Sequence, residues 1–180
     1  MPRTFAFLRA INVGGRTVPM AQLKAFFEGL GLESVETFIA SGNVVFDAST
    51  ETGGPLQRRI EGHLRESLGY EVVTFLRTSR ELAALVKGCP FDAEEVAAAE
   101  ALNVALLHAP LSEEAQSRLQ TLETEVDAFR TSGREVWWLC RVRQSDSAFS
   151  NAVFERTVKA KATFRGFNTL QRLAAKYLKA

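Results

Sequence analysis

Arg9, Asn12 and the pair Gly14-Gly15 stand close together near the start of the chain, and they are well suited to binding chemistry. An arginine guanidinium is a planar fork of N–H donors that matches phosphate or carboxylate oxygens. Glycines adopt backbone conformations with positive φ and let N–H groups approach an anion closely. The pattern therefore predicts either an anion-binding loop or a sharp turn, without a ligand, between a strand and a helix that begins near Pro19.

A second group of polar residues occurs further along the chain, in Ser41-Gly42-Asn43 and again at Arg165 and Asn168. An arginine at a strand end either makes a structural ion pair or clamps a ligand, because burying it unpaired is costly. We expect an anion pocket if Arg165 converges with Arg9 near the paired glycines. The candidate ligand-binding residues are Arg9, Asn12, Gly14, Gly15, Ser41, Gly42, Asn43, Arg165 and Asn168.

Other kinds of site lack their sequence signatures. The chain has no Gly-x-Gly-x-x-Gly, Walker-type lysine, Gly-x-Ser-x-Gly elbow or His-Glu-x-x-His pair, so no catalytic residue is assigned. Cys89, Cys140, His63 and His108 lack metal-ligand spacing, so we predict no metal and no cofactor. The cysteines are typical of buried, reduced thiols in a cytoplasmic protein. No apolar run approaches the roughly 20 residues of a membrane span, so no membrane association is expected.

Two N-terminal segments carry a family resemblance. Residues 8–15 read Leu-Arg-Ala-Ile-Asn-Val-Gly-Gly, and residues 41–46 read Ser-Gly-Asn-Val-Val-Phe. With Pro19-Met20 they resemble the bacterial domain-of-unknown-function family 1697, whose opening reads Arg-Gly-Ile-Asn-Val-Gly-Gly and whose hairpin reads Gln-Ser-Gly-Asn. Ala10 stands where the family has Gly, and Ala40 stands where it has Gln. The resemblance covers nearly the whole chain and implies a fold, but no activity, since the family has no established one.

The C-terminal part of the resemblance contains departures. The family reads Thr-Thr-Arg-Asn-Trp-Asn-Thr where residues 163–169 read Thr-Phe-Arg-Gly-Phe-Asn-Thr. Arg165, Asn168 and Thr169 therefore match, while the Asn-Trp pair is lost. A Ser-Lys-Leu segment of the family is replaced around Ser147-Ala148-Phe149. The resemblance thus implies that a site shared by the family can differ in this chain.

Hydrophobic periodicity in the first half predicts strand, helix, strand, strand, helix, strand and a trailing helix. Gly31 and Gly69 are expected to end the first two helices, and Thr78 with Glu81 resembles a capping box for the third. A turn within Ser41-Gly42-Asn43 joins the middle strands as a hairpin. The expected strands are Thr4–Arg9, Val35–Ala40, Val44–Phe46 and Val72–Arg77, and the helices begin near Pro19, Leu56 and Thr78.

The second half repeats this order, with strands at Leu102–Leu107, Ala128–Arg130, Glu135–Cys140 and Ala162–Arg165, and with helices capped by Ser112, near Ser147–Val158 and capped by Asn168. We therefore predict an α+β fold of two ferredoxin-like βαββαβ halves, each with a trailing helix, that arose by internal duplication. The predicted halves are residues 1–89 and residues 90–180. An acidic connecting segment opens the second half.

Apolar side chains occupy both faces of the predicted sheets. Alternation places Phe5 and Phe7 on one face of the first strand, together with Arg9. These rings either pack in the core or form a stacking platform for single-stranded RNA. Trp137 and Trp138 are adjacent in a predicted strand, so they must point to opposite faces.

The formal net charge is only +1, but the charge is unevenly distributed. Residues 92–127 carry nine acidic side chains and one arginine, a net of −8, whereas residues 141–180 carry nine basic and two acidic side chains, a net of +7. Such asymmetry marks either solvated faces or a basic binding surface. The leading hypothesis is a cytoplasmic protein that binds an anionic ligand, either a nucleotide, a phosphorylated metabolite or nucleic acid. The alternatives are an enzyme acting on a small anionic substrate at the same site, and a protein-interaction module. The oligomeric state is not predicted.

Overall fold

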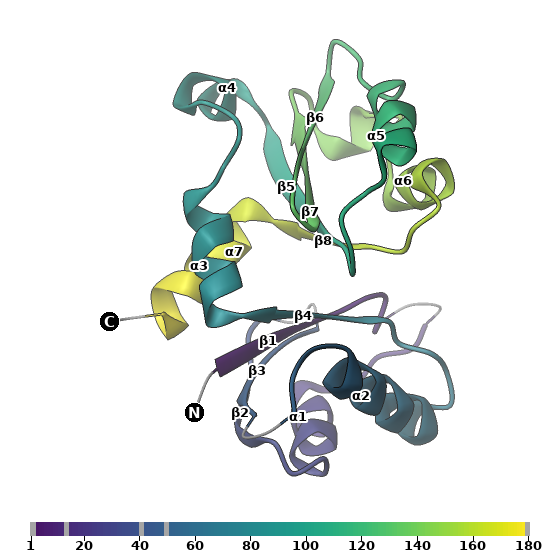
Figure 1. Cartoon of the computed structure of the whole chain (residues 1–180), viewed down its shortest axis with the longest axis vertical. Helices are drawn as coiled ribbons and strands as arrows, with labels where there is room; N and C mark the ends of the chain where they lie inside the picture. The colour runs from purple at the N-terminus through teal and green to yellow at the C-terminus, as the bar shows by residue number, and fades with distance from the viewer. Residues whose placement is uncertain (1–2, 13–14, 40–41, 49–50, 179–180) are drawn as a thin grey trace. The chain divides into compact units, whose positions relative to one another are not determined.

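The chain forms two four-stranded antiparallel sheets, one in each of two compact units, Met1–Ala83 and Ala84–Ala180 (Figure 1). The computed structural model describes residues 3–12, 15–39, 42–48 and 51–178. In both sheets the first strand of the unit is central and pairs with the third and the fourth strands. This is the strand order of the ferredoxin-like βαββαβ arrangement, so the predicted α+β duplication is confirmed.

The first unit is built from β1 Arg3–Leu8, α1 Met20–Glu28, β2 Glu33–Thr37, β3 Asn43–Asp47, α2 Gly53–Leu68 and β4 Thr74–Thr78, and α3 Ser79–Lys87 follows. The strands pair in the order β2-β3-β1-β4, and α1 and α2 lie on the same side of this sheet (Figure 1). The capping box predicted at α3 is confirmed, because Thr78 and Glu81 each accept the other's backbone N–H with a side-chain oxygen.

The core of the first unit lies between its sheet and the helices α1 and α2. Leu56, Ile60 and Leu64 recur every fourth residue along α2, which places them on one face, and all three are fully buried. Each such side chain contributes about 1.5–3 kcal/mol when it leaves water. The helix ends at Gly69, whose φ of 82° is the left-handed conformation that glycine adopts most easily.

The second unit contains α4 Ala93–Ala98, β5 Ala101–Leu106, α5 Glu113–Gln120, β6 Asp127–Ser132, β7 Glu135–Cys140, the 3₁₀ turn η1 Gln144–Asp146, α6 Asn151–Val158, β8 Thr163–Gly166 and α7 Phe167–Tyr177. The strands pair in the order β6-β7-β5-β8. Helices α5 and α6 cover one face of this sheet with an apolar cluster that includes Leu119, Phe129 and Phe154. Helix α7 lies on the opposite face (Figure 1).

The two adjacent tryptophans of β7 serve the two faces of the second sheet, as their neighbouring positions predict. Trp138 packs among Phe149 and Phe164 on the side of α5 and α6. Trp137 makes an edge contact with Phe167 of α7, at 5.0 Å between ring centroids. Both indoles are therefore part of the packing of this unit, which α7 completes on the second face.

Two helix starts in the second unit differ from prediction. Asn168 does not cap α7: the N-cap is Gly166, and the helix begins at Phe167. The reason is packing, because Phe167 is buried against Trp137 and this fixes the turn before Asn168 is reached. The helix predicted from Ser147 begins only at Asn151, where Ser150 accepts the Val153 N–H as an N-cap.

Candidate functional site

The two N-terminal motifs meet at one end of the first sheet, where β1 ends and β3 begins. Leu8, at the end of β1, donates its N–H to the carbonyl oxygen of Gly42 at 2.9 Å. Arg9 donates its N–H to the Val73 carbonyl, also at 2.9 Å, so the chain leaves β1 while still held between β3 and β4. The loop after β1 and the hairpin between β2 and β3 are therefore neighbours, as the candidate site requires.

Gly42 is the point at which the hairpin touches the loop. Its φ is 79°, and a Cβ atom added there would lie 3.0 Å from Ile11 Cγ2 and 3.1 Å from Leu8 Cβ. Positive φ and close contact both disfavour a side chain at this position. Asn43 next to it is 1% exposed and donates Nδ2 to the Phe38 carbonyl at 2.9 Å, which closes the hairpin. Asn43 thus has a structural hydrogen bond. The predicted site residues Gly14 and Ser41 lie outside the described residues.

Two side chains fasten the loop after β1. Asn12 Oδ1 accepts the backbone N–H of Val18 at 2.9 Å, which spans the loop just before α1. Tyr70, from the turn after α2, donates its hydroxyl to the Ile11 carbonyl at 2.9 Å. Ile11 itself is buried in the core. These contacts fix the loop close to both of its ends, after β1 and before α1.

Arg16 is a candidate residue that the sequence did not single out. Its guanidinium lies over the Tyr70 ring, 4.4 Å from the ring centroid, and the side chain is exposed. Within the described part of the chain no carboxylate forms an ion pair with it. A planar guanidinium on an aromatic face keeps its N–H edge free for oxygen ligands. The only sign of this residue in the sequence is its position directly after the glycine pair. Its aromatic partner, Tyr70, is distant in the sequence, so no local pattern links the two.

The backbone at this end of the sheet adopts several left-handed conformations. Ala10 has a φ of 53°, in the left-handed region that favours glycine. Gly15 has a φ of 77° and open space around its Cα. Ile39, before the hairpin turn, has a φ of 57° and is 38% exposed. Left-handed geometry costs an L-residue about 1–2 kcal/mol, so Ala10 and Ile39 store strain beside the loop.

Arg165 and Asn168, the other predicted site residues, belong to the second unit. Arg165 Nη1 donates to Thr163 Oγ1 at 2.7 Å and to the Phe164 carbonyl at 2.9 Å. Burial lowers the pKa of the Arg165 guanidinium to about 10, so it is still charged at neutral pH. Asn168 is exposed in the first turn of α7. Convergence of these residues with the N-terminal loop stays a prediction.

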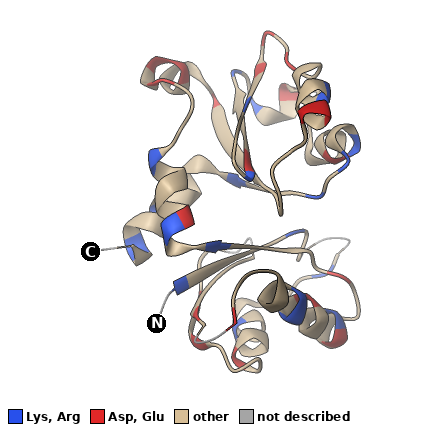
Figure 2. Ribbon diagram, in the orientation of Figure 1, with Lys and Arg blue, Asp and Glu red and all other residues tan. Residues whose placement is uncertain are grey.

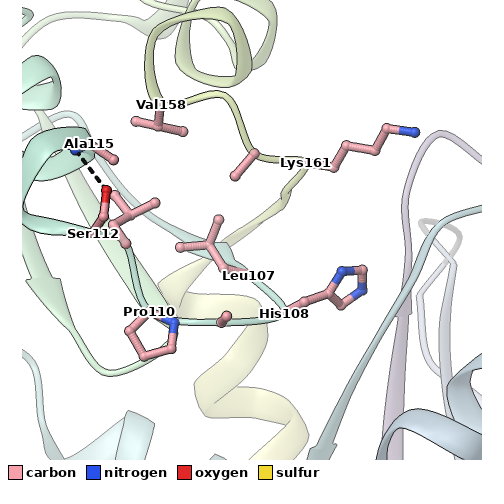
Figure 3. A pocket seen from close by; sticks show the side chains of 10 residues that line it. Leu107, His108, Pro110, Ser112, Ala115, Val158 and Lys161 are labelled. Carbon is pink, nitrogen blue, oxygen red and sulfur yellow. Dashed lines mark hydrogen bonds between the residues drawn. The ribbon is translucent and has the colours of Figure 1, made fainter.

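The second unit has a shallow pocket of about 230 Å³ at the position equivalent to the N-terminal loop, between the β5–α5 and α6–β8 connections. Its floor is apolar, with Leu107 and Val158 (Figure 3). Ser112 Oγ accepts the Ala115 N–H and is thereby used to cap α5. The side chains of His108 and Lys161 extend away from the apolar floor (Figure 3). No set of polar groups converges on this pocket, so it is not a convincing anion site.

The charge asymmetry of the sequence lies within the second unit. Its acidic side chains include those on α4 and the first turn of α5, whereas α7 carries basic side chains (Figure 2). Within the described residues, no three His, Cys, Asp or Glu side chains gather as metal ligands would. None of the described helices combines the length and the apolarity needed to cross a bilayer.

The fold and the fastened loop define a class of protein: a duplicated ferredoxin-like α+β chain with a glycine-containing polar loop at one end of its first sheet. The model of the family described as protein of unknown function (DUF1697) matches residues 1–137, and the chain belongs to this family. A solved structure with the same fold is that of the conserved bacterial protein SP0830 from Streptococcus pneumoniae, at 21% identity and a TM-score of 0.71, with 97% of each chain covered. No curated protein matches the chain.

Proposed function

We propose that the first unit binds a small phosphate-bearing molecule, a nucleotide or a phosphorylated metabolite, at the loop of residues 9–16 beside Gly42. The observation that carries the proposal is Arg16, whose exposed guanidinium rests on Tyr70. Tyr70 is itself fixed by its hydrogen bond to the loop backbone at Ile11. A guanidinium held in one plane loses less conformational entropy when it binds an oxyanion than a freely rotating one does.

The backbone beside Arg16 supports the same ligand class. Gly15 is exposed, and no atom lies within 4 Å of the place where its Cβ would be, so its backbone is open to a ligand on that side. Arg9, at the start of the loop, is half-buried and is the second arginine of this segment. Phosphate oxygens accept hydrogen bonds from backbone N–H groups and guanidinium forks together, which is the combination present here.

The exposed apolar side chains favour a ligand with an organic part rather than inorganic phosphate alone. Met20 and Ile39 are the exposed large hydrophobic residues among those described, at 40% and 38%. Met20 begins α1, into which the loop leads, and Ile39 precedes the hairpin turn. Both segments lie at the same end of the sheet, because β1 runs antiparallel to β3. Pockets for small molecules commonly combine a few polar anchors with such apolar surface.

The proposal is tested with ligands that share a phosphate and differ in the rest of the molecule. Thermal shift is measured with ATP, glucose 6-phosphate and a single-stranded oligonucleotide, and the probe that stabilises most is then titrated by calorimetry. Arg16→Ala should weaken binding about tenfold or more, since a hydrogen bond to a charged group contributes about 1.5–3 kcal/mol. The affinity of Arg16→Lys should lie between that of the unmodified protein and that of Arg16→Ala, because lysine keeps the positive charge but lacks the planar fork of donors.

The matched control is Arg58→Ala, which removes an exposed arginine of α2 in the same unit. It should bind like the unmodified protein. Equal affinity for Arg16→Ala and Arg58→Ala would contradict the proposal, as would a failure of every phosphate probe to stabilise the protein. If only the oligonucleotide binds and its affinity falls steeply with salt, the ligand is nucleic acid instead.

A further inference from the structure

A second pocket, of about 250 Å³, lies in the second unit beneath the start of β6. It is formed by the turn after α5, the segment before α6 and the first turns of α6. Its wall is mostly apolar, and its polar groups are two threonines and one carboxylate. The residues that line it are Thr121, Leu122, Thr124, Asp127, Ala148, Phe149 and Val153.

The carboxylate in this pocket belongs to Asp127, which is 2% exposed. Asp127 Oδ1 accepts the indole N–H of Trp138 at 2.8 Å, and Oδ2 accepts the hydroxyl of Ser147 at 2.7 Å. Thr124 lies at 3.5 Å from Oδ2, and its Oγ1 accepts the Asp127 N–H at 3.1 Å. These contacts hold the carboxylate in one orientation at the pocket wall.

Asp127 has no positively charged partner among the described residues of the chain. A buried charge normally has a counter-charge, because leaving it alone in a medium of low polarity is costly. Two neutral donors at short distance occupy only part of the roughly four lone-pair positions of a carboxylate. The remaining acceptor capacity and the negative charge are available to a cation that enters the pocket.

The carboxylate of Asp127 also lies beside a thiol. Cys140 pairs with Asp127 across the β6–β7 ladder. The pKa of the Cys140 thiol is raised, chiefly by its burial and further by the charge of Asp127. The Asp127 carboxylate gives one part of the pocket wall a negative charge, while Leu122, Phe149 and Val153 make the rest apolar.

We propose that this pocket binds a small organic cation, a primary ammonium carried on a compact apolar body. The ammonium group donates to Asp127 and supplies the missing positive charge. The apolar body packs against Leu122, Phe149 and Val153, which leaves the hydrogen bonds of Trp138 and Ser147 in place. This site is independent of the proposed phosphate site, since it lies in the other unit and takes the opposite charge.

Benzylamine, which is protonated at neutral pH, is a suitable probe, and benzyl alcohol is its neutral counterpart. The indole N–H signal of Trp138 is followed by NMR, because this group touches the carboxylate directly. Trp137, on the other face of the sheet, is the internal reference, and Trp137→Phe assigns the two signals. We expect a saturable shift of the Trp138 signal alone, with benzyl alcohol binding at least about tenfold more weakly. Equal binding of the two probes, or no saturation with benzylamine, would overturn the proposal.

Two variants test the charge and the cavity separately. Asp127→Asn keeps the shape of the side chain and should remove the preference for benzylamine over benzyl alcohol. Ala148→Leu places a larger side chain at an exposed position of the lining and should block both probes while the carboxylate remains. Its control is Ala152→Leu on α6, an exposed residue outside the pocket, which should bind normally. If Ala148→Leu binds benzylamine as the unmodified protein does, the probe does not bind in this pocket and the proposal is wrong. This test remains decisive even if Asp127→Asn does not fold.

Discussion

The connection from β1 to α1 and the connection from β5 to α5 occupy the same position in two copies of one topology, yet they are built differently. The first runs from Arg9 to Pro19, contains left-handed residues at Ala10 and Gly15, and is fastened by side chains. The second runs only from residue 107 to residue 112, is mainly apolar, and ends in Ser112 as an ordinary N-cap.

This difference shows which features of the connection the fold requires and which are additional to it. The short second connection shows that a ferredoxin-like unit needs only a few residues and one cap to enter its first helix. The longer first connection includes a strained alanine and lies beside a strained isoleucine, costs that folding alone does not require. Strained residues that are retained at an exposed, polar end of a sheet are typical of a ligand-binding loop. Substitutions at the hairpin glycines, at the side chains that fasten the loops and at Ala10 should separate the two connections with progressively smaller effects.

The hairpin glycines should give the largest contrast. Gly42 and Gly133 are equivalent residues with φ values of 79° and 56°, but only Gly42 is crowded by neighbouring side chains. Gly133→Ala should cost about 1–2 kcal/mol from the left-handed backbone alone. Gly42→Ala adds an overpacking cost of about 1–3 kcal/mol, because its Cβ would press on Ile11 and Leu8. Denaturant unfolding of both variants measures the difference.

The location of the damage is as informative as its size. Gly42→Ala should speed hydrogen exchange at the Leu8 amide, which bonds to the Gly42 carbonyl, while the amides of the second sheet stay protected. Gly133→Ala should leave the Leu8 amide unchanged. If the two alanine variants lose the same stability, the packing of the hairpin against the loop is not important, and the proposed site loses its second half.

Loop fastening gives the next contrast. Asn12→Ala and Ser112→Ala each remove a side-chain oxygen that accepts a backbone N–H. The N–H belongs to Val18, just before α1, in the first case and to Ala115, in the first turn of α5, in the second. Each should lower stability by about 1 kcal/mol, as the loss of a helix cap does. Only Asn12→Ala should also weaken the binding of phosphate ligands, because it frees the loop that carries Arg16. Calorimetric titration of both variants at equal fraction folded decides this, and weakened binding by Ser112→Ala would show that the effect is not local.

Much of the fold was predictable because its signals are local. Alternating apolar residues, turn glycines and the Thr78–Glu81 capping box act within a few residues, so the sequence alone indicates them. The start of α7 was predicted two residues late, because the burial of Phe167 against Trp137 depends on a partner in another strand. Tertiary contact overrode the capping preference of Asn168.

The candidate sites depended on distant partners and were only partly predictable. The glycine motifs located the loop, and the structure brings Gly42 against it. Arg16 became notable only through Tyr70, which the chain reaches after the whole of α2. Asp127 likewise follows a turn and belongs to no recognisable sequence motif. Its proposed role depends on hydrogen bonds from Trp138 and Ser147, which no local spacing links to it. Sites assembled by side chains from separate elements leave no periodic signal in the sequence.

The smallest and sharpest contrast concerns Ala10. Its φ of 53° should cost about 1 kcal/mol relative to glycine, so Ala10→Gly should raise the free energy of unfolding by up to that amount in spite of glycine's greater freedom when unfolded. Ser112→Gly is a suitable comparison, since the residue has an ordinary extended backbone and loses a cap, so it should be neutral or slightly destabilising. A stabilised Ala10→Gly protein that binds phosphate ligands as before would mean that the strain is incidental. A stabilised protein with weaker binding would mean that the strained alanine holds the loop in its binding geometry, whereas a destabilised one would contradict the left-handed conformation at this residue.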